Sequence, residues 1–296
     1  MTPVDYEYLR KLLKDRSGLM LSADKQYLVE SRLMPLARKA GLPGISDLVQ
    51  KMKAGSEPTI VRVVEAMTTN ETFFFRDKVP FDHFRDTIMP AMIKARGQRR
   101  SLRIWSAACS TGQEPYSLAM CLKEMATAIS GWRIEIIATD LSQEVLEKSR
   151  AGIFSQFEVQ RGLPIQFLVK YFAQVGEMWQ VSSDIRAMVQ FRPLNLMQDF
   201  SALGTFDIVF CRNVLIYFDQ PTKIGVFGRL AKSMEPDSFL VLGAAETVVG
   251  LTDAFRSYPD KRGLYQPTRD VVSPPLAPVL AAKAGVSALK FAAAPR

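Results

Sequence analysis

Apolar residues recur at helical spacing through the first third of the chain. One amphipathic helix is indicated by a face made of Tyr8, Leu9, Leu12 and Leu13. A second is indicated by a face made of Val29, Leu33, Leu36 and Ala40. Gly18 and Gly41 follow these faces, as glycine often does at helix C-termini. With two further short helices, one capped by Ser46 and one opened by Pro58, residues 1–68 are predicted to form an all-helical domain.

From Leu102 onward, segments typical of buried strands alternate with helical patterns. The strand-like segments are LRIWSAA, WRIEIIATD, FDIVFCRN and FLVLGA. Such alternation is typical of a doubly wound, mostly parallel sheet, so residues 101–266 are predicted to form an α/β domain. Residues 154–186 break the rhythm and are predicted to form a small β-subdomain inserted into that domain.

Two segments lie outside these domains. Residues 69–100 form a bridge, in which Pro90 should kink a helix or restart it because proline donates no backbone hydrogen bond. Residues 267–296 are rich in Pro, Ala and Val without periodicity, and we expect them to be a disordered tail.

Composition excludes several classes of protein. His83 is the only histidine among 296 residues, so the chain lacks the parts of a Ser-His-Asp or Cys-His site, and we expect no metal site. Three cysteines without a CxxC pair argue against a disulfide framework. No segment approaches the roughly 20 apolar residues of a membrane span, so no membrane insertion is expected. With no secretory signal, a cytoplasmic location is expected.

The charge is positive and uneven. Lys and Arg number 38 against 30 Asp and Glu, a net charge of +8. Residues 1–100 carry 18 of the basic and 12 of the acidic residues, hence +6 of that total. Such a surface suits an acidic partner, whether nucleic acid, anionic lipid or a Glu-rich protein, but an ordinary solvated surface has the same composition.

Candidate chemistry gathers where the predicted strands end, which is where open α/β sheets bind ligands. The loop that ends at Gly112 is built of small residues, which allow a ligand close to the backbone or simply make a tight turn. Asp140 ends the next strand, 28 residues after Gly112, and could bind ribose hydroxyls or cap a helix, a role open also to Ser142. Arg212 and Asn213 end a third strand, where a buried polar pair is costly unless it is used.

Four segments together resemble the signature motifs of the CheR-type chemotaxis receptor methyltransferases. They are MTTNETFFFRD, IWSAACSTGQEPYSLAM, ATDLS and FDIVFCRNVLIYFD. The resemblance covers residues 5–266 and implies a Rossmann-like domain that binds S-adenosylmethionine (SAM), behind a helical N-terminal domain. It implies methyl transfer from SAM to glutamates in the cytoplasmic signalling domain of methyl-accepting chemotaxis receptors. The products would be glutamate methyl esters, which serve sensory adaptation, and S-adenosylhomocysteine (SAH).

The resemblance also implies a set of cofactor-binding residues. These are Asn70, Thr72, Arg76, Glu114, Asp140, Asn195, Leu196, Asn213 and Val214. The arginine would pair with the cofactor's carboxylate, and the aspartate would bind its ribose. Gln113 stands where the family more often has Glu, a departure that leaves Glu114 in place.

The residues are compatible with this chemistry without a general base. A glutamate carboxylate, with a pKa of about 4.3, is already ionised at neutral pH, so the chain must only position the reactants and exclude water. Arg212 and Tyr217 are the candidate catalytic residues of the transfer pocket. Cys109 and Cys211 are interpreted as packing residues, and the run Phe73–Phe75 as core between domains more than as a stacking platform.

Substrate recognition is predicted from a basic stripe on the second helix. Lys25, Arg32 and Lys39 fall at heptad spacing and could contact an acidic receptor helix, although a solvated helix face looks the same. Some family members dock on a receptor's C-terminal pentapeptide through the β-subdomain. The hairpin loop at residues 173–177 is short here, which predicts methylation independent of such a peptide.

Two alternatives from other classes remain. One is a regulatory module of a chemosensory pathway that binds SAM or SAH with little catalysis. The other is a nucleic-acid methyltransferase, prompted by the basic charge. Amine methylation of bases typically uses an Asn/Asp-Pro-Pro-Tyr/Phe loop, and the corresponding strand end reads Asn-Val-Leu-Ile at residues 213–216, which argues against nucleic acid as a partner.

Overall fold

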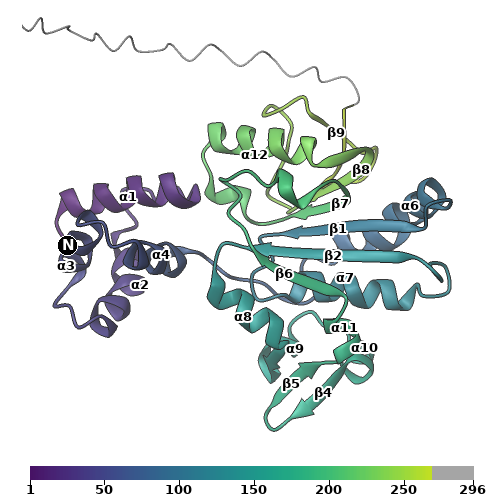
Figure 1. Ribbon diagram of the computed structural model, residues 1–296, viewed down its shortest axis with the longest axis horizontal. Coiled ribbons are helices and arrows are strands. Elements are labelled where there is room, and N and C mark those ends of the chain that lie inside the picture. Colours follow the sequence, from purple (N-terminus) through teal and green to yellow (C-terminus); the bar gives the residue numbers. More distant parts are fainter. Residues whose placement is uncertain (269–296) are drawn as a thin grey trace, which may run out of the picture.

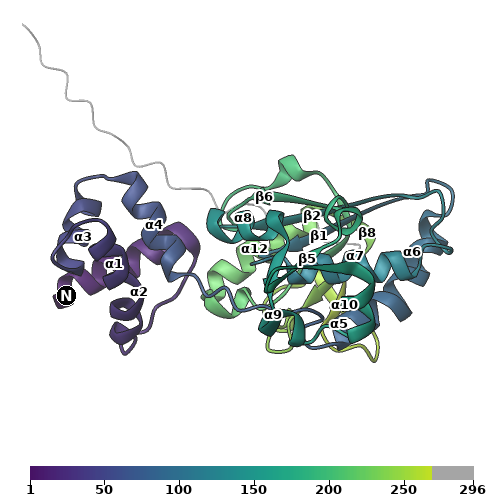
Figure 2. The ribbon, with the colours of Figure 1, turned by 90° about the horizontal axis from the view of Figure 1, so that it is seen from below.

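The computed structural model describes residues 1–268, in which a helical N-terminal unit lies beside a larger α/β unit (Figure 1). Figure 2 shows the helical unit as a separate lobe on one side of the α/β unit. The predicted tail, residues 267–296, lies outside the described residues except for its first two positions. Within residues 1–268, every helix is too short or too polar to cross a bilayer.

The N-terminal unit consists of four helices around their own core. They are α1 (Pro3–Ser17), α2 (Gln26–Lys39), α3 (Ile45–Lys53) and α4 (Glu57–Met67). Thr2 and Asp5 form a capping box at the start of α1, and Gly18 ends it in the left-handed conformation. The buried face of α2 is Val29, Leu33 and Ala37. Leu36 is half-buried and packs against the same core, as predicted. The prediction of Ala40 on this face was wrong, because Ala40 lies beyond the last helical residue and is exposed.

The bridge to the α/β unit is helical from Val79. It comprises α5 (Val79–His83), a π-helical turn η1 (Phe84–Ile88) and α6 (Met89–Arg96). Pro90 lies in the first turn of α6, where its missing N–H is tolerated, so the helix restarts there as predicted. Phe74 is fully buried and packs edge-on against Phe154 and Phe172 of the inserted subdomain. The core interpretation is therefore confirmed for Phe74.

The α/β unit is built on one seven-stranded sheet with the order β6-β2-β1-β7-β8-β10-β9. Its strands are β1 (Ser101–Ala107), β2 (Arg133–Asp140), β6 (Val189–Pro193), β7 (Phe206–Cys211), β8 (Met234–Leu242), β9 (Phe255–Ser257) and β10 (Leu264–Pro267). The first five strands in the sheet order run parallel, β10 runs antiparallel to them, and β9 pairs antiparallel with β10, which confirms the mostly parallel α/β fold. Ala107 is in register with Thr139 and Cys211, so three strands end together at the edge that faces the helical unit (Figure 1).

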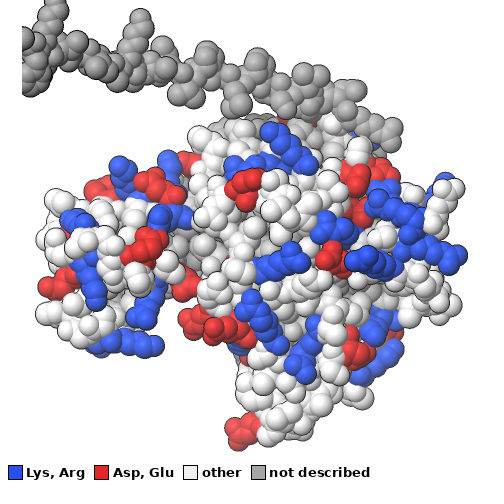
Figure 3. Space-filling model, viewed as in Figure 1, with Lys and Arg blue, Asp and Glu red and all other residues white. Residues whose placement is uncertain are grey.

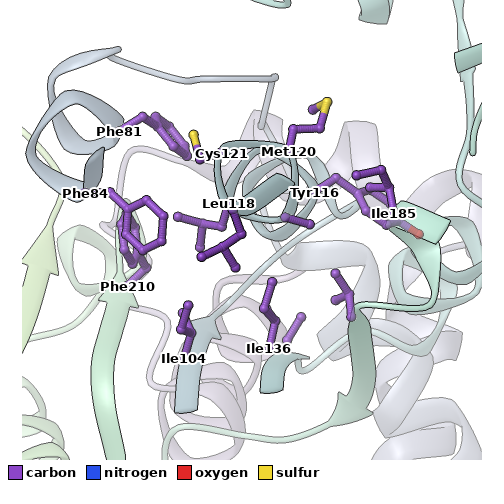
Figure 4. Close-up of a cluster of buried hydrophobic side chains, with 14 of the residues drawn as sticks. Phe81, Phe84, Ile104, Tyr116, Leu118, Met120, Cys121, Ile136, Ile185 and Phe210 are labelled. Carbon is purple, nitrogen blue, oxygen red and sulfur yellow. The ribbon is translucent and has the colours of Figure 1, made fainter. Parts of the chain in front are cut away.

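Helices cover the sheet and bury its central strands. The longer ones are α7 (Gln113–Glu124), α8 (Gln143–Ala151) and α12 (Gln220–Lys232), with 3-10 turns η2 (Ser201–Leu203) and η3 (Leu215–Tyr217). Figure 4 shows Leu118 of α7 pointing onto Ile104, Ile136 and Phe210 from three adjacent strands. These aliphatic and aromatic side chains are fully buried and account for the continuous apolar pattern of the strands.

A second, three-stranded sheet with the order β3-β5-β4 makes up the inserted subdomain, at the bottom of Figure 1. Its elements are β3 (Ile153–Ser155), α9 (Gln156–Gln160), α10 (Ile165–Tyr171), β4 (Phe172–Val175), β5 (Met178–Val181) and α11 (Ser183–Arg186). Only Gly176 and Glu177 separate β4 from β5, so the hairpin loop is a two-residue turn.

Candidate functional site

A cavity lies between the helical unit and the carboxyl edge of the large sheet, and it opens to solvent. The empty space in it and its mouth, open solvent included, is about 960 Å³. Five segments of the α/β unit and bridge line it, and Ser17 and Leu19 close it from the end of α1. All the residues predicted for catalysis or cofactor binding are in its wall: Asn70, Thr72, Arg76, Glu114, Asp140, Asn195, Leu196, Arg212, Asn213, Val214 and Tyr217. The fold therefore brings together positions that are up to 147 residues apart in sequence.

The loop between β1 and α7 forms the floor of the cavity. Ala108, Ser110 and Gly112 all have positive φ, at 58°, 51° and 94°. A Cβ on Gly112 would lie 3.0 Å from Ser149, so this position combines left-handed backbone with close packing. The tight turn brings the Ser110 N–H to the carboxylate of Asp140, at 2.8 Å.

Asp140 is a buried carboxylate at the end of β2. Its Oδ1 accepts the Ser142 N–H at 3.0 Å and its Oδ2 accepts the Ser110 N–H. Desolvation raises the pKa of Asp140 above its ordinary value, against the effect of these two hydrogen bonds. Ser142 caps α8 by accepting the Val145 N–H, so the helix cap that follows β2 is Ser142 and not Asp140. Each Asp140 oxygen retains acceptor capacity toward the cavity.

Arg212 links the start of α7 to the bridge segment by hydrogen bonds. Its guanidinium donates to Glu114 Oε2 and to Asp77 Oδ2, both at 2.8 Å, and to the carbonyl of Arg76. The other oxygen of Glu114 accepts from Ser106 at 2.7 Å. The Arg212 side chain is only 1% exposed, and its Nε has no hydrogen-bond partner within residues 1–268. The predicted catalytic arginine is thus committed to groups of its own chain.

Glu246 is a functional candidate that sequence reasoning missed. Its carboxylate accepts four backbone N–H groups, those of Asn213, Val214, Leu215 and Gly243, at 2.7–3.0 Å. Asn213, which lines the cavity, has a φ of 58° and is held in this left-handed conformation by the contact. The signal was an acidic residue three positions after a glycine that follows a buried strand, but three of its four partners lie 31–33 residues earlier.

Two predicted cofactor residues use their polar groups within the chain. The Asn195 side chain donates to the carbonyl of Arg16, at 2.6 Å, and accepts the Met197 N–H. Arg76 donates to the carbonyl of Glu71, and its guanidinium lies 5.7 Å from the ring of Phe73. Both side chains line the cavity, so each is within reach of a ligand there.

The predicted basic stripe of α2 is not a set of three free cations. Arg32 donates to the carbonyls of Met67 and Thr68, at 2.6 and 2.9 Å, and to the hydroxyl of Thr69. It therefore stabilises the end of α4 and the start of the bridge, where the orphan carbonyls of a helix need donors. Lys25 precedes the first residue of α2, and Lys39 is exposed at its end. The cavity wall contains none of the three among the described residues.

The cysteines beside the cavity are packing residues. Cys109 and Cys211 are buried, and burial raises the pKa of both thiols well above the ordinary value. A thiol that stays protonated at neutral pH is a poor nucleophile. Burial also lowers the pKa of His83, which is outside the cavity wall.

Family models match both units of the chain. The family model of the "CheR methyltransferase, SAM binding domain" matches residues 70–264, and that of the "CheR methyltransferase, all-alpha domain" matches residues 4–68. The chain is 42% identical over 256 residues to Chemotaxis protein methyltransferase 1 of Pseudomonas aeruginosa, covering 85% of this chain and 93% of that protein. It is 42% identical over 255 residues to Chemotaxis protein methyltransferase 1 of Vibrio cholerae (85% and 92%). It is 34% identical over 256 residues to the Chemotaxis protein methyltransferase of Borreliella burgdorferi (84% and 90%).

Proposed function

The chain belongs to the CheR methyltransferase family, and we propose that its substrates are glutamate side chains in the cytoplasmic signalling domain of methyl-accepting chemotaxis receptors. It is a SAM-dependent protein methyltransferase, and its products here would be glutamate methyl esters and SAH. The observation that carries the proposal is the single cavity that gathers all the predicted cofactor and catalytic residues at the carboxyl edge of the sheet.

The residues of the cavity fit the cofactor. Asp140 has acceptor capacity for the two ribose hydroxyls, and the left-handed loop beside it lets a ligand approach the backbone. Glu114 is a buried carboxylate suited to the amino group of SAM, and Arg76 is a cation suited to its carboxylate. Leu196 and Asn213 supply an apolar surface and an amide for adenine. When bound, SAM supplies an electrophilic methyl group.

Methyl transfer to a glutamate needs no base from the protein. The carboxylate is ionised at neutral pH, so the chain contributes positioning and exclusion of water. We assign Tyr217, in the cavity wall, to contact with the target glutamate. We assign Arg212 to positioning, because its terminal nitrogens are taken by Glu114, Asp77 and the carbonyl of Arg76.

In this proposal, exposed Lys and Arg side chains of the helical unit contact the receptor. Lys and Arg side chains are spread over this unit in Figure 3, interspersed with acidic ones. Lys39 is exposed at the end of α2, whereas Arg32 is occupied within the fold. Lys39→Glu should raise the KM for receptor several-fold and leave SAH affinity unchanged, whereas an unchanged KM would remove Lys39 from the interface.

The β-subdomain supports a function independent of a receptor pentapeptide. Its hairpin has a two-residue turn, which offers little loop to hold a peptide. Removal of the last five residues of the cognate receptor should leave the methylation rate within about twofold, whereas micromolar binding of the free peptide in calorimetry would contradict the proposal.

Transfer of labelled methyl groups tests the function. The purified protein is incubated with methyl-labelled SAM and receptor-containing membranes from its own cell. Label in receptor bands that alkali releases as methanol would identify a carboxyl methyl ester. Tight SAM binding without such label would instead favour the regulatory module, and an absence of SAM binding would refute both.

A further inference from the structure

The end of α1 contacts the two loops that carry Tyr217 and Asn195. The Met20 N–H donates to the carbonyl of Tyr217 at 2.9 Å, and the Lys14 ammonium lies 2.7 Å from Asp219. The carbonyl of Arg16 accepts from the Asn195 side chain at 2.6 Å. Residues 14–20, here termed the α1 clamp, therefore fix two cavity loops through backbone and charged groups.

Gly18 is the point of closest approach in the α1 clamp. A Cβ on Gly18 would lie 2.8 Å from the Sδ of Met197 and 2.9 Å from Cε1 of Phe218, the residue after Tyr217. Contacts this short force a shift. The end of the Met197 side chain is flexible and can move, but the Phe218 ring is packed in the core, so a side chain at Gly18 must displace this ring or separate α1 from the turn that carries it. Gly18 also has a φ of 76°, which any L-residue adopts at a cost. Its neighbours Ser17 and Leu19 line the cavity itself.

We infer that Gly18 is a positioning residue for methyl transfer, because it lets the α1 clamp close on the turn that carries Tyr217. The inference deepens the proposed function and rests on it. It gives the helical unit a role inside the active site, besides contact with the receptor. Displacement of a reacting group by about 1 Å can reduce a rate by about 100-fold, so contact at Gly18 is expected to matter for turnover.

Gly41 provides a matched control for Gly18. It follows the end of α2 with a φ of 71°, so an alanine there meets the same backbone strain. No described atom lies within 4 Å of the place that a Cβ on Gly41 would take, so no loop is displaced. The difference between Gly18→Ala and Gly41→Ala therefore isolates the contact with Met197 and Phe218 from left-handed strain.

The first readout is kcat per SAH-binding site, with active sites counted by calorimetric titration. Gly18→Ala should lower this kcat by about tenfold or more, with the KM for receptor little changed, whereas Gly41→Ala should stay within about twofold of the wild type. A merely structural role would reduce the number of SAH-binding sites and leave turnover per site intact. Equal turnover per site in the two variants would overturn the inference.

A second pair of variants changes surface lysines of α1 and leaves its glycine in place. Lys14 is about half exposed, and Lys14→Met removes its ion pair with Asp219. Lys11 is exposed on the same helix, so Lys11→Met is its control. We expect a two- to fivefold loss of kcat per site for Lys14→Met alone, in line with a partly exposed ion pair of about 0.5–1 kcal/mol. No difference between the two would count against the α1 clamp.

Hydrogen exchange separates this inference from the proposed function. The Tyr217 and Phe218 amides donate to Val214 and Leu215 within the turn. Gly18→Ala should speed amide exchange in residues 213–219, whereas Gly41→Ala should not. If the wild type transfers no methyl group to receptor, the proposed function fails. Unchanged exchange in Gly18→Ala would overturn the clamp, whatever the activity.

Discussion

At each end of strand β7 a buried arginine pairs with carboxylates, Arg96 of α6 at its start and Arg212 just beyond its end, yet the two ends have different roles. At its start, Asp207 accepts from Arg96 at 2.7 Å, from Arg99, and from the Arg103 N–H at 2.8 Å. Just beyond its end, Arg212 pairs with two carboxylates and lines the cavity. The same chemistry stabilises the fold at one edge of the sheet and lines the candidate site at the other.

The two buried arginines differ in how many of their guanidinium nitrogens have a hydrogen-bond partner. All three nitrogens of the Arg96 guanidinium donate, to Asp207 and Asp237, so this network is complete within the fold. Arg212 retains an Nε without a partner among the described residues, and its partner Glu114 faces the cavity. Buried polar groups are normally satisfied, and Arg212 is the residue of the cavity wall with an exception among the described residues. The carboxyl edge is where parallel strands leave such groups beside a ligand.

The carboxylates of the two edges also shift in opposite directions. The hydrogen bond from Arg96 lowers the pKa of Asp237, at the scaffold edge. Desolvation raises the pKa of Asp140, at the cavity edge. A paired carboxylate stabilises the folded state when ionised, whereas desolvation disfavours the ionised form of a buried carboxylate.

Replacement of the buried arginine at each edge should give the largest difference between the two edges in turnover and in stability. Arg212→Met leaves Glu114 without its cation, so we expect a loss of about 100-fold or more in kcat per SAH-binding site, or roughly 3 kcal/mol. Arg96→Met removes a buried pair of the scaffold and should lower the free energy of unfolding by about 3–5 kcal/mol, with turnover per site within about twofold. Methyl transfer and urea denaturation measure the two effects.

Arg99→Met gives a milder version of the scaffold change, because that side chain is 46% exposed. If either scaffold variant lost turnover per site as severely as Arg212→Met, the division of roles between the edges would be wrong.

Glu246→Gln is expected to have the next largest effect. An amide has one acceptor oxygen in place of two, so some of the four backbone N–H groups lose a charged partner and Asn213 loosens. We expect SAH affinity to fall by about tenfold, which is about 1.4 kcal/mol. Glu147→Gln, on the exposed face of α8, is the control and should bind SAH like the wild type. Equal affinities would show that the loop holds its conformation without Glu246.

The pH dependence should differ in sign between Asp237 and Asp140. The stability that Asp237 contributes is present above its ordinary pKa of 3.8 and lost as pH falls through its lowered pKa. Ionisation of Asp140 instead removes stability as pH rises through its raised pKa, above 3.8. Carbon NMR titration of the side-chain carboxyls should place the midpoint of Asp140 above that of Asp237, and the reverse order would contradict the assigned environments.

The sequence predicts those features of the fold and the site that depend on residues close together in the chain. Strand and helix periodicity indicated the sheet, and small or polar residues after each strand pointed to Asp140 and Asn213. Residues paired over long distances gave no such signal. Glu246 accepts from a loop some 30 residues earlier in the sequence. Arg32, which was predicted to face the receptor, donates to a carbonyl at the end of α4. Gly18 lies close to Phe218 of the other unit, so its place at the end of α1 could be predicted from local sequence and this approach could not.

Calorimetric titration of SAH tests most directly that the carboxyl edge is the working edge of the sheet. The wild type, Asp140→Ala and Asp237→Ala are compared at neutral pH. The wild type and Asp237→Ala should bind one SAH per chain with similar affinity, and Asp140→Ala should bind at least about tenfold more weakly, because the ribose hydroxyls lose their acceptor. Equal binding by Asp140→Ala, or a loss confined to Asp237→Ala, would contradict the account.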